Sequence, residues 1–122
     1  MMTRLRSAAI LVSDQDAALD FYVGTLGFEK RIDYDMGQGM RFLTIALPGD
    51  PTEVVLGTAA LNGPDSIKNS LTFVVDDIDT TYAELTAKGV TFTQEPEKFP
   101  WGGKGTWILD LDDNKHFVCS EP

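Results

Sequence analysis

Residues 7–14 read SAAILVSD, and residues 70–77 read SLTFVVDD. Each stretch is an apolar run of strand length that ends in an aspartate, a residue type that commonly caps the start of a helix. A helix is predicted after each stretch, because apolar side chains then recur at helical spacing until Gly27 in the first case and Gly89 in the second. The chain therefore contains two related strand–helix units.

The chain beyond each of these glycines is rich in β-forming residues. Apolar and β-branched runs predict strands at 28–34, 41–47 and 53–58, and again at 90–94, 106–111 and 115–120. Each half thus has the order strand, helix, three strands. Two strand–helix units can resemble each other by chance, but the repeated order of elements favours an internal duplication.

Length and composition fit one folded domain. The chain has 122 residues, of which 43% are hydrophobic and 24% charged, which is enough apolar material for a single core. A turn-forming cluster, NGPD at residues 62–65, predicts a linker between the halves. We therefore expect a single α+β domain over residues 1–122, with one module at about 1–58, a linker at about 59–69 and a second module at about 70–122.

The charge excludes several classes of partner. Ten Lys and Arg against nineteen Asp and Glu give a net charge of −9, which repels nucleic acid and anionic lipid. No apolar run approaches the roughly 20 residues of a membrane-spanning helix, and no secretory cleavage site follows Arg4 and Arg6. Cys119 is the only cysteine, so no internal disulfide can form. We expect a soluble cytoplasmic protein that binds neither nucleic acid nor membranes.

The combined segments resemble the vicinal oxygen chelate superfamily, which includes glyoxalase I, extradiol dioxygenases and the fosfomycin and bleomycin resistance proteins. The resemblance covers nearly the whole chain and departs from the family's usual Asp-Pro-Asp-Gly-Asn at Leu111 and Asp113. It implies two βαβββ modules whose curled sheets enclose a cleft, commonly in a homodimer. The matching segments are residues 11–14, 17–22, 26–28, 73–77, 88–90 and 110–114.

Enzymes of that superfamily hold a divalent metal in the cleft, and the resemblance places their ligand positions on this sequence. Two histidine positions fall on Ser7 and Ser70, and a glutamate position falls on Phe117. Neither a hydroxyl nor a benzyl group is a good ligand for such metals. Glu53 is the one carboxylate left, and one carboxylate does not retain a catalytic metal. We therefore expect no metal and no other cofactor.

His116 and Cys119 are the remaining candidates for chemistry. As the only histidine, His116 could act as a lone acid or base, but a half-buried strand residue is the favoured interpretation. Residues three apart on a strand point to opposite faces, so the two cannot form a nucleophilic pair without a bulge. Cys119 is interpreted as a small wall residue. The acidic run at 110–113 is interpreted as a solvated turn rather than a calcium site.

Strand alternation then predicts which side chains line the cleft. If Ser7 and Ser70 face it, every second residue of their strands faces it too, and Trp101 lies in a glycine-rich loop that could close over the opening. These side chains could form an apolar and aromatic pocket, or they could meet and fill the space. The candidate ligand-binding residues are Ser7, Ala9, Leu11, Tyr34, Phe42, Glu53, Val55, Ser70, Thr72, Val74, Trp101, Phe117 and Cys119.

These observations favour a homodimeric member of the superfamily without the usual metal ligands, which binds a neutral or cationic aromatic small molecule in its cleft. Two alternatives stay open. One is a metal-dependent lyase or dioxygenase that uses Glu53 with non-standard ligands. The other is a regulatory or interaction module with a vestigial cleft. No catalytic residue is assigned, and catalysis itself stays open.

Overall fold

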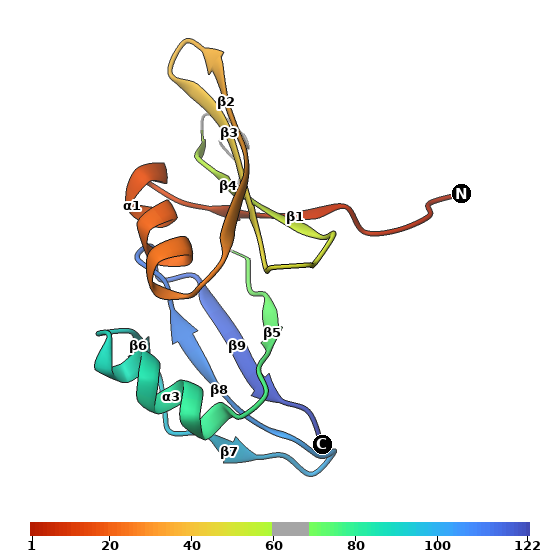
Figure 1. Ribbon diagram of the computed structural model, residues 1–122, viewed down its shortest axis with the longest axis vertical. Coiled ribbons are helices and arrows are strands. Elements are labelled where there is room, and N and C mark those ends of the chain that lie inside the picture. Colours follow the sequence, from red (N-terminus) through yellow and green to blue (C-terminus); the bar gives the residue numbers. More distant parts are fainter. Residues whose placement is uncertain (60–68) are drawn as a thin grey trace. The chain divides into compact units, whose positions relative to one another are not determined.

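The computed structural model describes residues 1–59 and 69–122, which fall into two compact units, Met1–Asn69 and Ser70–Pro122 (Figure 1). Most of the predicted linker, residues 60–68, lies outside the described residues. Each unit combines one β-sheet with helical structure, as expected of an α+β fold. Among the described residues, none of the helices is long and apolar enough to cross a membrane.

The first unit has the predicted order of a strand, a helix and three strands. Its sheet has the order β1-β4-β3-β2, with β1 and β4 parallel and the other neighbours antiparallel. The helix continues into a π-helical segment, η1, before the second strand begins. The elements are β1 (Ser7–Leu11), α1 (Gln15–Leu19), η1 (Asp20–Thr25), β2 (Glu29–Gly37), β3 (Met40–Ala46) and β4 (Glu53–Gly57).

The second unit again begins with a strand and a helix. Its sheet has the order β5-β9-β8-β6, and a further short strand, β7, also pairs with β8. The strand expected at residues 90–94 is only two residues long, and β7 was not expected, because such short strands carry too little alternation to recognise. The elements are β5 (Thr72–Val74), α3 (Ile78–Ala87), β6 (Thr91–Phe92), β7 (Glu97–Lys98), β8 (Lys104–Leu109) and β9 (Lys115–Ser120).

The helix boundaries follow the predicted signals. Asp14 caps α1 and Asp77 caps α3, each through a side-chain oxygen that accepts backbone N–H groups of the first turn. Gly27 and Gly89 follow the two helical segments with φ of 86° and 87°. This left-handed conformation favours glycine and ends a helix. Both pairs of predictions are confirmed.

One set of alternate side chains is buried in each sheet, and in β3 and β4 of the first sheet the neighbouring side chains, such as Thr44 and Val55, are buried as well. In the first unit Ile10, Leu56 and Tyr22 are fully buried. In the second, Ile108 and Ile78 are as deeply buried, the latter from the first turn of α3. Each such side chain contributes about 1.5–3 kcal/mol to stability. The side chains of opposite parity are therefore left for other contacts.

Candidate functional site

One face of the first sheet carries seven of the predicted site residues, most of which are half-buried. The register pairs Ser7 with Glu53 and Thr44 with Val55, and residues two apart on a strand share a face. Exposure along this face ranges from Val55, which is buried, to Tyr34, which is exposed on the hairpin. The seven residues are Ser7, Ala9, Leu11, Tyr34, Phe42, Glu53 and Val55.

The open face of the second sheet carries four more predicted residues. The register pairs Thr72 with Phe117 and Val74 with Cys119 across parallel strands. It also pairs Phe117 with Trp107 on β8, so all five side chains share one face. Thr72 and Val74 are exposed, whereas Phe117 and Cys119 are half-buried. This face is therefore partly covered along β9 and open along β5.

Four aromatic side chains form a row on this face, which we call the aromatic row. Trp101 stacks on Phe99 with ring centroids 4.9 Å apart and planes only 2° from parallel. Phe99 lies 5.4 Å from Phe117, and Phe117 lies 4.8 Å from Trp107. The Lys115 ammonium is 4.8 Å from the Trp107 ring centroid, which is within the range of a cation–π interaction.

A pocket of about 170 Å³ opens beside the Trp101 end of the aromatic row. Phe99, Trp101 and Phe117 line it together with Cys119 and Glu121. Trp101 is 77% exposed, so much of its indole surface is open to a ligand. Sites for whole drug-sized molecules measure about 300–1,000 Å³. The pocket therefore accommodates a planar fragment, with the rest of a larger ligand lying outside it.

Glycines shape the loop at this pocket and the packing of Phe117 beside it. The loop carrying Trp101 is closed by hydrogen bonds from Phe99 N–H to Gly103 C=O and from Gly102 N–H to Phe99 C=O. Gly102 and Gly103 have φ of 94° and 84°, which other residues rarely adopt. A Cβ on Gly105 would lie 2.7 Å from the Phe117 Cζ atom. Gly105 thus leaves the space that the Phe117 ring occupies.

Of the charged groups at the pocket, Lys104 is held in an ion pair and Glu121 is acidic. The Lys104 ammonium lies 2.8 Å from an oxygen of the Asp79 carboxylate, which offsets its charge. Burial, and then the negative charge of Glu121, raise the pKa of the Cys119 thiol. Cys119 is therefore a neutral thiol near pH 7 and a poor nucleophile. Its interpretation as a wall residue agrees with this environment.

His116 lies on the opposite face of β9 and is fully buried. Its Nδ1 atom accepts a hydrogen bond of 3.1 Å from Leu71 N–H, and its ring packs edge-on against Phe73. Burial lowers the pKa of His116, although the nearby Asp110 carboxylate opposes this shift. The imidazole is therefore neutral at pH 7. The interpretation of His116 as a core residue is confirmed, with complete rather than partial burial.

The positions that the family resemblance assigns to metal ligands do not fit a divalent metal. Glu53 lies beside Ser7 on the first sheet, Phe117 presents a benzyl group, and Ser70 offers an exposed hydroxyl. First-row metals bind imidazole, carboxylate and thiolate groups instead. Across residues 1–59 and 69–122, no three His, Cys, Asp or Glu side chains gather so as to hold a metal ion.

Sequence reasoning missed Phe99 and Trp107 as members of the aromatic row and Gly105 as its spacer. One signal could have revealed Trp107. In an antiparallel hairpin, residues equally distant from the turn pair with each other. Trp107 and Phe117 each lie five positions from Asp112 and are paired in the sheet. Phe99 carries no such signal, because its contacts depend on the conformation of its loop.

Comparison with known proteins agrees with this architecture. Residues 4–116 match the family model described as Glyoxalase/Bleomycin resistance protein/Dioxygenase superfamily. YetH of Bacillus subtilis (strain 168) is 32% identical over 99% of this chain and 100% of its own. A superfamily member from Sphaerobacter thermophilus DSM 20745 has a TM-score of 0.91 and 43% identity, with 98% of each chain covered. TnmS3, an antibiotic binding protein from Streptomyces sp. CB03234, has a TM-score of 0.87 and 29% identity, with 99% of this chain and 98% of its own covered.

Proposed function

Because the chain belongs to the Glyoxalase/Bleomycin resistance protein/Dioxygenase superfamily, we propose that it binds a small aromatic molecule on the open face of its second sheet. The observation that carries the proposal is the exposed indole of Trp101, stacked on Phe99 beside a pocket of about 170 Å³. A planar ligand stacks on this indole and inserts one edge into the pocket that Trp101, Phe99 and Phe117 line. Binding, rather than catalysis, is the activity proposed.

The ligand is neutral or cationic. Aromatic faces attract planar and cationic groups, each contact contributing about 0.5–2 kcal/mol. The Lys104 ammonium is held by Asp79, and Glu121 adds negative charge to the pocket. A net charge of −9 further favours cations around the molecule. Anionic ligands are therefore expected to bind weakly.

Similarity to an antibiotic binding protein supports the binding of a small molecule. TnmS3 is 29% identical to this chain over nearly its full length. The residues at the metal-ligand positions, Ser7, Ser70 and Phe117, favour binding over metal-assisted chemistry. A small molecule with an extended aromatic system is the ligand that the aromatic row suits best.

Two further features complete the proposal. Strands β1 and β5 are each the outermost strand of their sheet, and edge strands favour pairing of two copies into a homodimer. The single cysteine is in keeping with a reducing cytoplasm.

A thermal-shift experiment tests the proposed binding. Proflavine serves as a planar cation, anthraquinone-2-sulfonate as a planar anion and catechol as a chelating diol. Proflavine is expected to raise the melting temperature of the wild type, and Trp101→Ala to abolish that rise. Leu111→Ala is the matched control, since Leu111 is 60% exposed in a different loop. Stabilisation by the anion or the diol alone, or an undiminished rise in Trp101→Ala, would show the proposal to be wrong.

A further inference from the structure

The aromatic row has a positive charge at one end and a negative charge at the other. Lys115 and Cys119 lie four positions apart on β9 and therefore share the face of the row. The Lys115 ammonium lies 4.8 Å from the centroid of the Trp107 ring. Glu121 follows the strand and lines the pocket beside Trp101. Lys115 and Glu121 are six positions apart in the sequence, which corresponds to about 20 Å along an extended strand.

The backbone beside Glu121 is held on two sides. The Ser120 Oγ atom accepts a hydrogen bond of 2.6 Å from Ile78 N–H in the first turn of α3. On the other side, a Cβ atom on Gly103 would lie 2.7 Å from the Ser120 carbonyl oxygen and 3.8 Å from the Glu121 Cα atom. The glycine loop that carries Trp101 thus packs directly against the backbone at Glu121. The carboxylate of Glu121 therefore belongs to the rim of the pocket.

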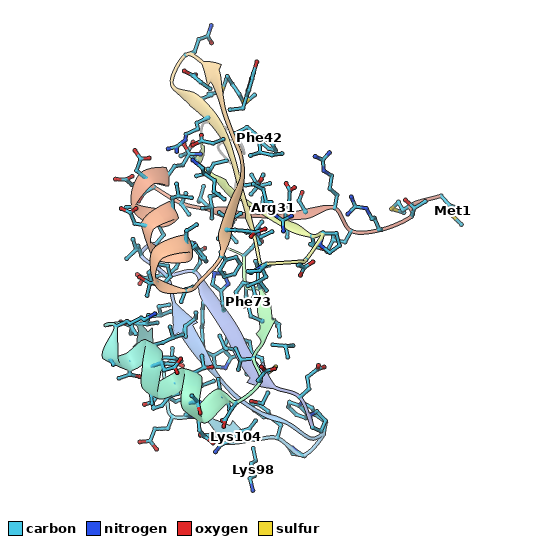
Figure 2. The ribbon with its side chains drawn as sticks, viewed as in Figure 1. Met1, Arg31, Phe42, Phe73, Lys98 and Lys104 are labelled. Carbon is cyan, nitrogen blue, oxygen red and sulfur yellow. The ribbon has the colours of Figure 1, made fainter. Side chains whose placement is uncertain are left out.

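The other charged residue that lines the pocket, Lys104, does not neutralise Glu121. The Lys104 ammonium lies 2.8 Å and 3.0 Å from the two carboxylate oxygens of Asp79. Figure 2 shows Lys104 beside the first turn of α3, where Asp79 lies. Within residues 1–59 and 69–122, no Lys, Arg or His side chain forms an ion pair with Glu121. The pocket therefore has a carboxylate whose charge is available to a ligand.

The negative charge of Glu121 also reaches the inside of the pocket. Cys119 lines the pocket and is half-buried. Burial raises the pKa of its thiol, and the charge of Glu121 raises it further. A positive group in the pocket would be stabilised by the same charge, because a carboxylate that disfavours a thiolate favours a cation.

We propose that the ligand of this pocket carries a protonated nitrogen and that Glu121 selects for it. This inference rests on the proposed function, and it adds the charge of the ligand and the residue that recognises that charge. The nitrogen lies beside Glu121, and the uncharged part of the ring system stacks on Trp101. The reverse orientation would bring the nitrogen towards Lys115, which already covers Trp107. Charge complementarity of this kind gives specificity more than affinity.

Calorimetric titration with two ligands of the same ring system tests this selection. Proflavine is a cation at pH 7.5, whereas acridine, its parent ring system, is neutral. At low ionic strength, Glu121→Gln is expected to weaken proflavine binding about threefold, as the loss of one surface charge contact would, and to leave acridine binding unchanged. Glu84→Gln is the matched control, because it removes the same charge from an exposed position on α3. It should leave both affinities unchanged.

The outcomes separate this inference from the proposed function. If proflavine binds Glu121→Gln as tightly as the wild type, the role of Glu121 is overturned and the binding site stands. An equal loss of proflavine and acridine affinity overturns that role too, because Glu121 would then shape the pocket rather than recognise charge. So does an equal loss of proflavine affinity in Glu84→Gln, which would reflect net charge alone. If neither ligand binds the wild type, the proposed function fails as well.

Discussion

Gly105 lies where any side chain would collide with the aromatic row. A Cβ there would come within 2.7 Å of Phe117 Cζ, 2.8 Å of Val118 C=O and 2.9 Å of Cys119 Cβ. All three atoms belong to strand β9 and one is a backbone oxygen, so the strain cannot be relieved by one flexible side chain.

Gly105→Ala is therefore expected to lower the free energy of unfolding by about 1–3 kcal/mol, as overpacking commonly does. Proflavine affinity should fall too, because the Phe117 ring must move into the pocket. Urea unfolding measures the first effect and calorimetric titration the second. Gly24→Ala is the control, since nothing lies within 4 Å of its Cβ position. Equal stability of the two variants would contradict the packing described for Phe117.

His116 gives the second unit a dependence on pH. Burial lowers its pKa from the ordinary value of 6.5. Below pH 6.5 the unfolded chain therefore binds a proton that the native chain does not bind. The stability that this residue contributes is complete above about pH 6.5 and is lost progressively as the pH falls. Protonation of Nδ1 also removes the hydrogen bond from Leu71 N–H.

The expected slope is up to about 1.4 kcal/mol per pH unit between pH 6.5 and the lowered pKa. His116→Asn provides the comparison, because its amide oxygen can accept the Leu71 N–H but does not titrate. Urea unfolding at pH 7.5, 6.5 and 5.5 measures both proteins. The wild type should lose stability relative to the variant as the pH falls. Parallel pH dependences would show that His116 is protonated equally in the native and unfolded chains.

At the residue scale, local signals in the sequence made Trp101 a candidate binding residue and His116 a strand residue. Trp101 lies in a loop that its neighbouring glycines mark, and His116 lies in an apolar strand that predicts burial. The contact of Trp101 with Phe99 could not be predicted from the sequence, because it depends on how the loop closes. To predict that Trp107 lies opposite Phe117 requires the register of β8 against β9, which depends on how the two strands pair.

At the scale of elements, the turn between β8 and β9 depends on Asp110. Its Oδ1 accepts hydrogen bonds from the N–H groups of Asp112 and Asn114, and its Oδ2 accepts one from the Asn114 amide. The interpretation of this acidic run as turn chemistry is confirmed, although Asp110 is buried rather than solvated. These contacts fix the hairpin that brings Trp107 opposite Phe117.

Asp110→Ala is expected to destabilise the protein by about 1–3 kcal/mol, because buried N–H groups lose their acceptor. Leu111→Ala in the same turn should change stability by less than about 0.5 kcal/mol, since Leu111 is exposed. Thermal unfolding of the two variants provides the measurement. A smaller loss in Asp110→Ala than in Leu111→Ala would refute this role of the carboxylate.

The elements themselves differ in how well the sequence predicts them. The ends of the helices were predictable, because local chemistry sets them. The helices start after Asp14 and Asp77 and end at Gly27 and Gly89. The length of the β2–β3 hairpin was not, because the strand signal at Tyr34 gives way to polar residues and glycine. Pairing with β3, rather than propensity, extends β2 to Gly37.

At the scale of the whole molecule, we expect the stability of the protein not to depend on a metal. Purified protein should contain no stoichiometric zinc, nickel, iron or manganese, and chelator should leave its melting temperature unchanged. The reason is that the positions of the family's metal ligands carry serine hydroxyls at Ser7 and Ser70 and a benzyl group at Phe117. These groups bind divalent metals more weakly than histidine or glutamate. Elemental analysis with thermal unfolding checks both points. A tightly bound metal near Glu53 would contradict them.

The internal duplication was the strongest signal at this scale, because two apolar runs, two caps and two glycines repeat in the same order. The same repeat predicted which strand residues share a face in each sheet, as the registers at Ser7 and Thr72 illustrate. Ligand identity does not follow from such alternation, since it depends on shape and charge within the pocket.

Intermolecular nuclear Overhauser effects show whether an aromatic ligand binds at Trp101. Proflavine is added to isotope-labelled protein, and contacts between its ring protons and protein side chains are recorded. We expect contacts to the Trp101 indole and the Cys119 side chain, with none to Leu111. Contacts confined to other surfaces, or contacts seen with anthraquinone-2-sulfonate but not with proflavine, would contradict this expectation.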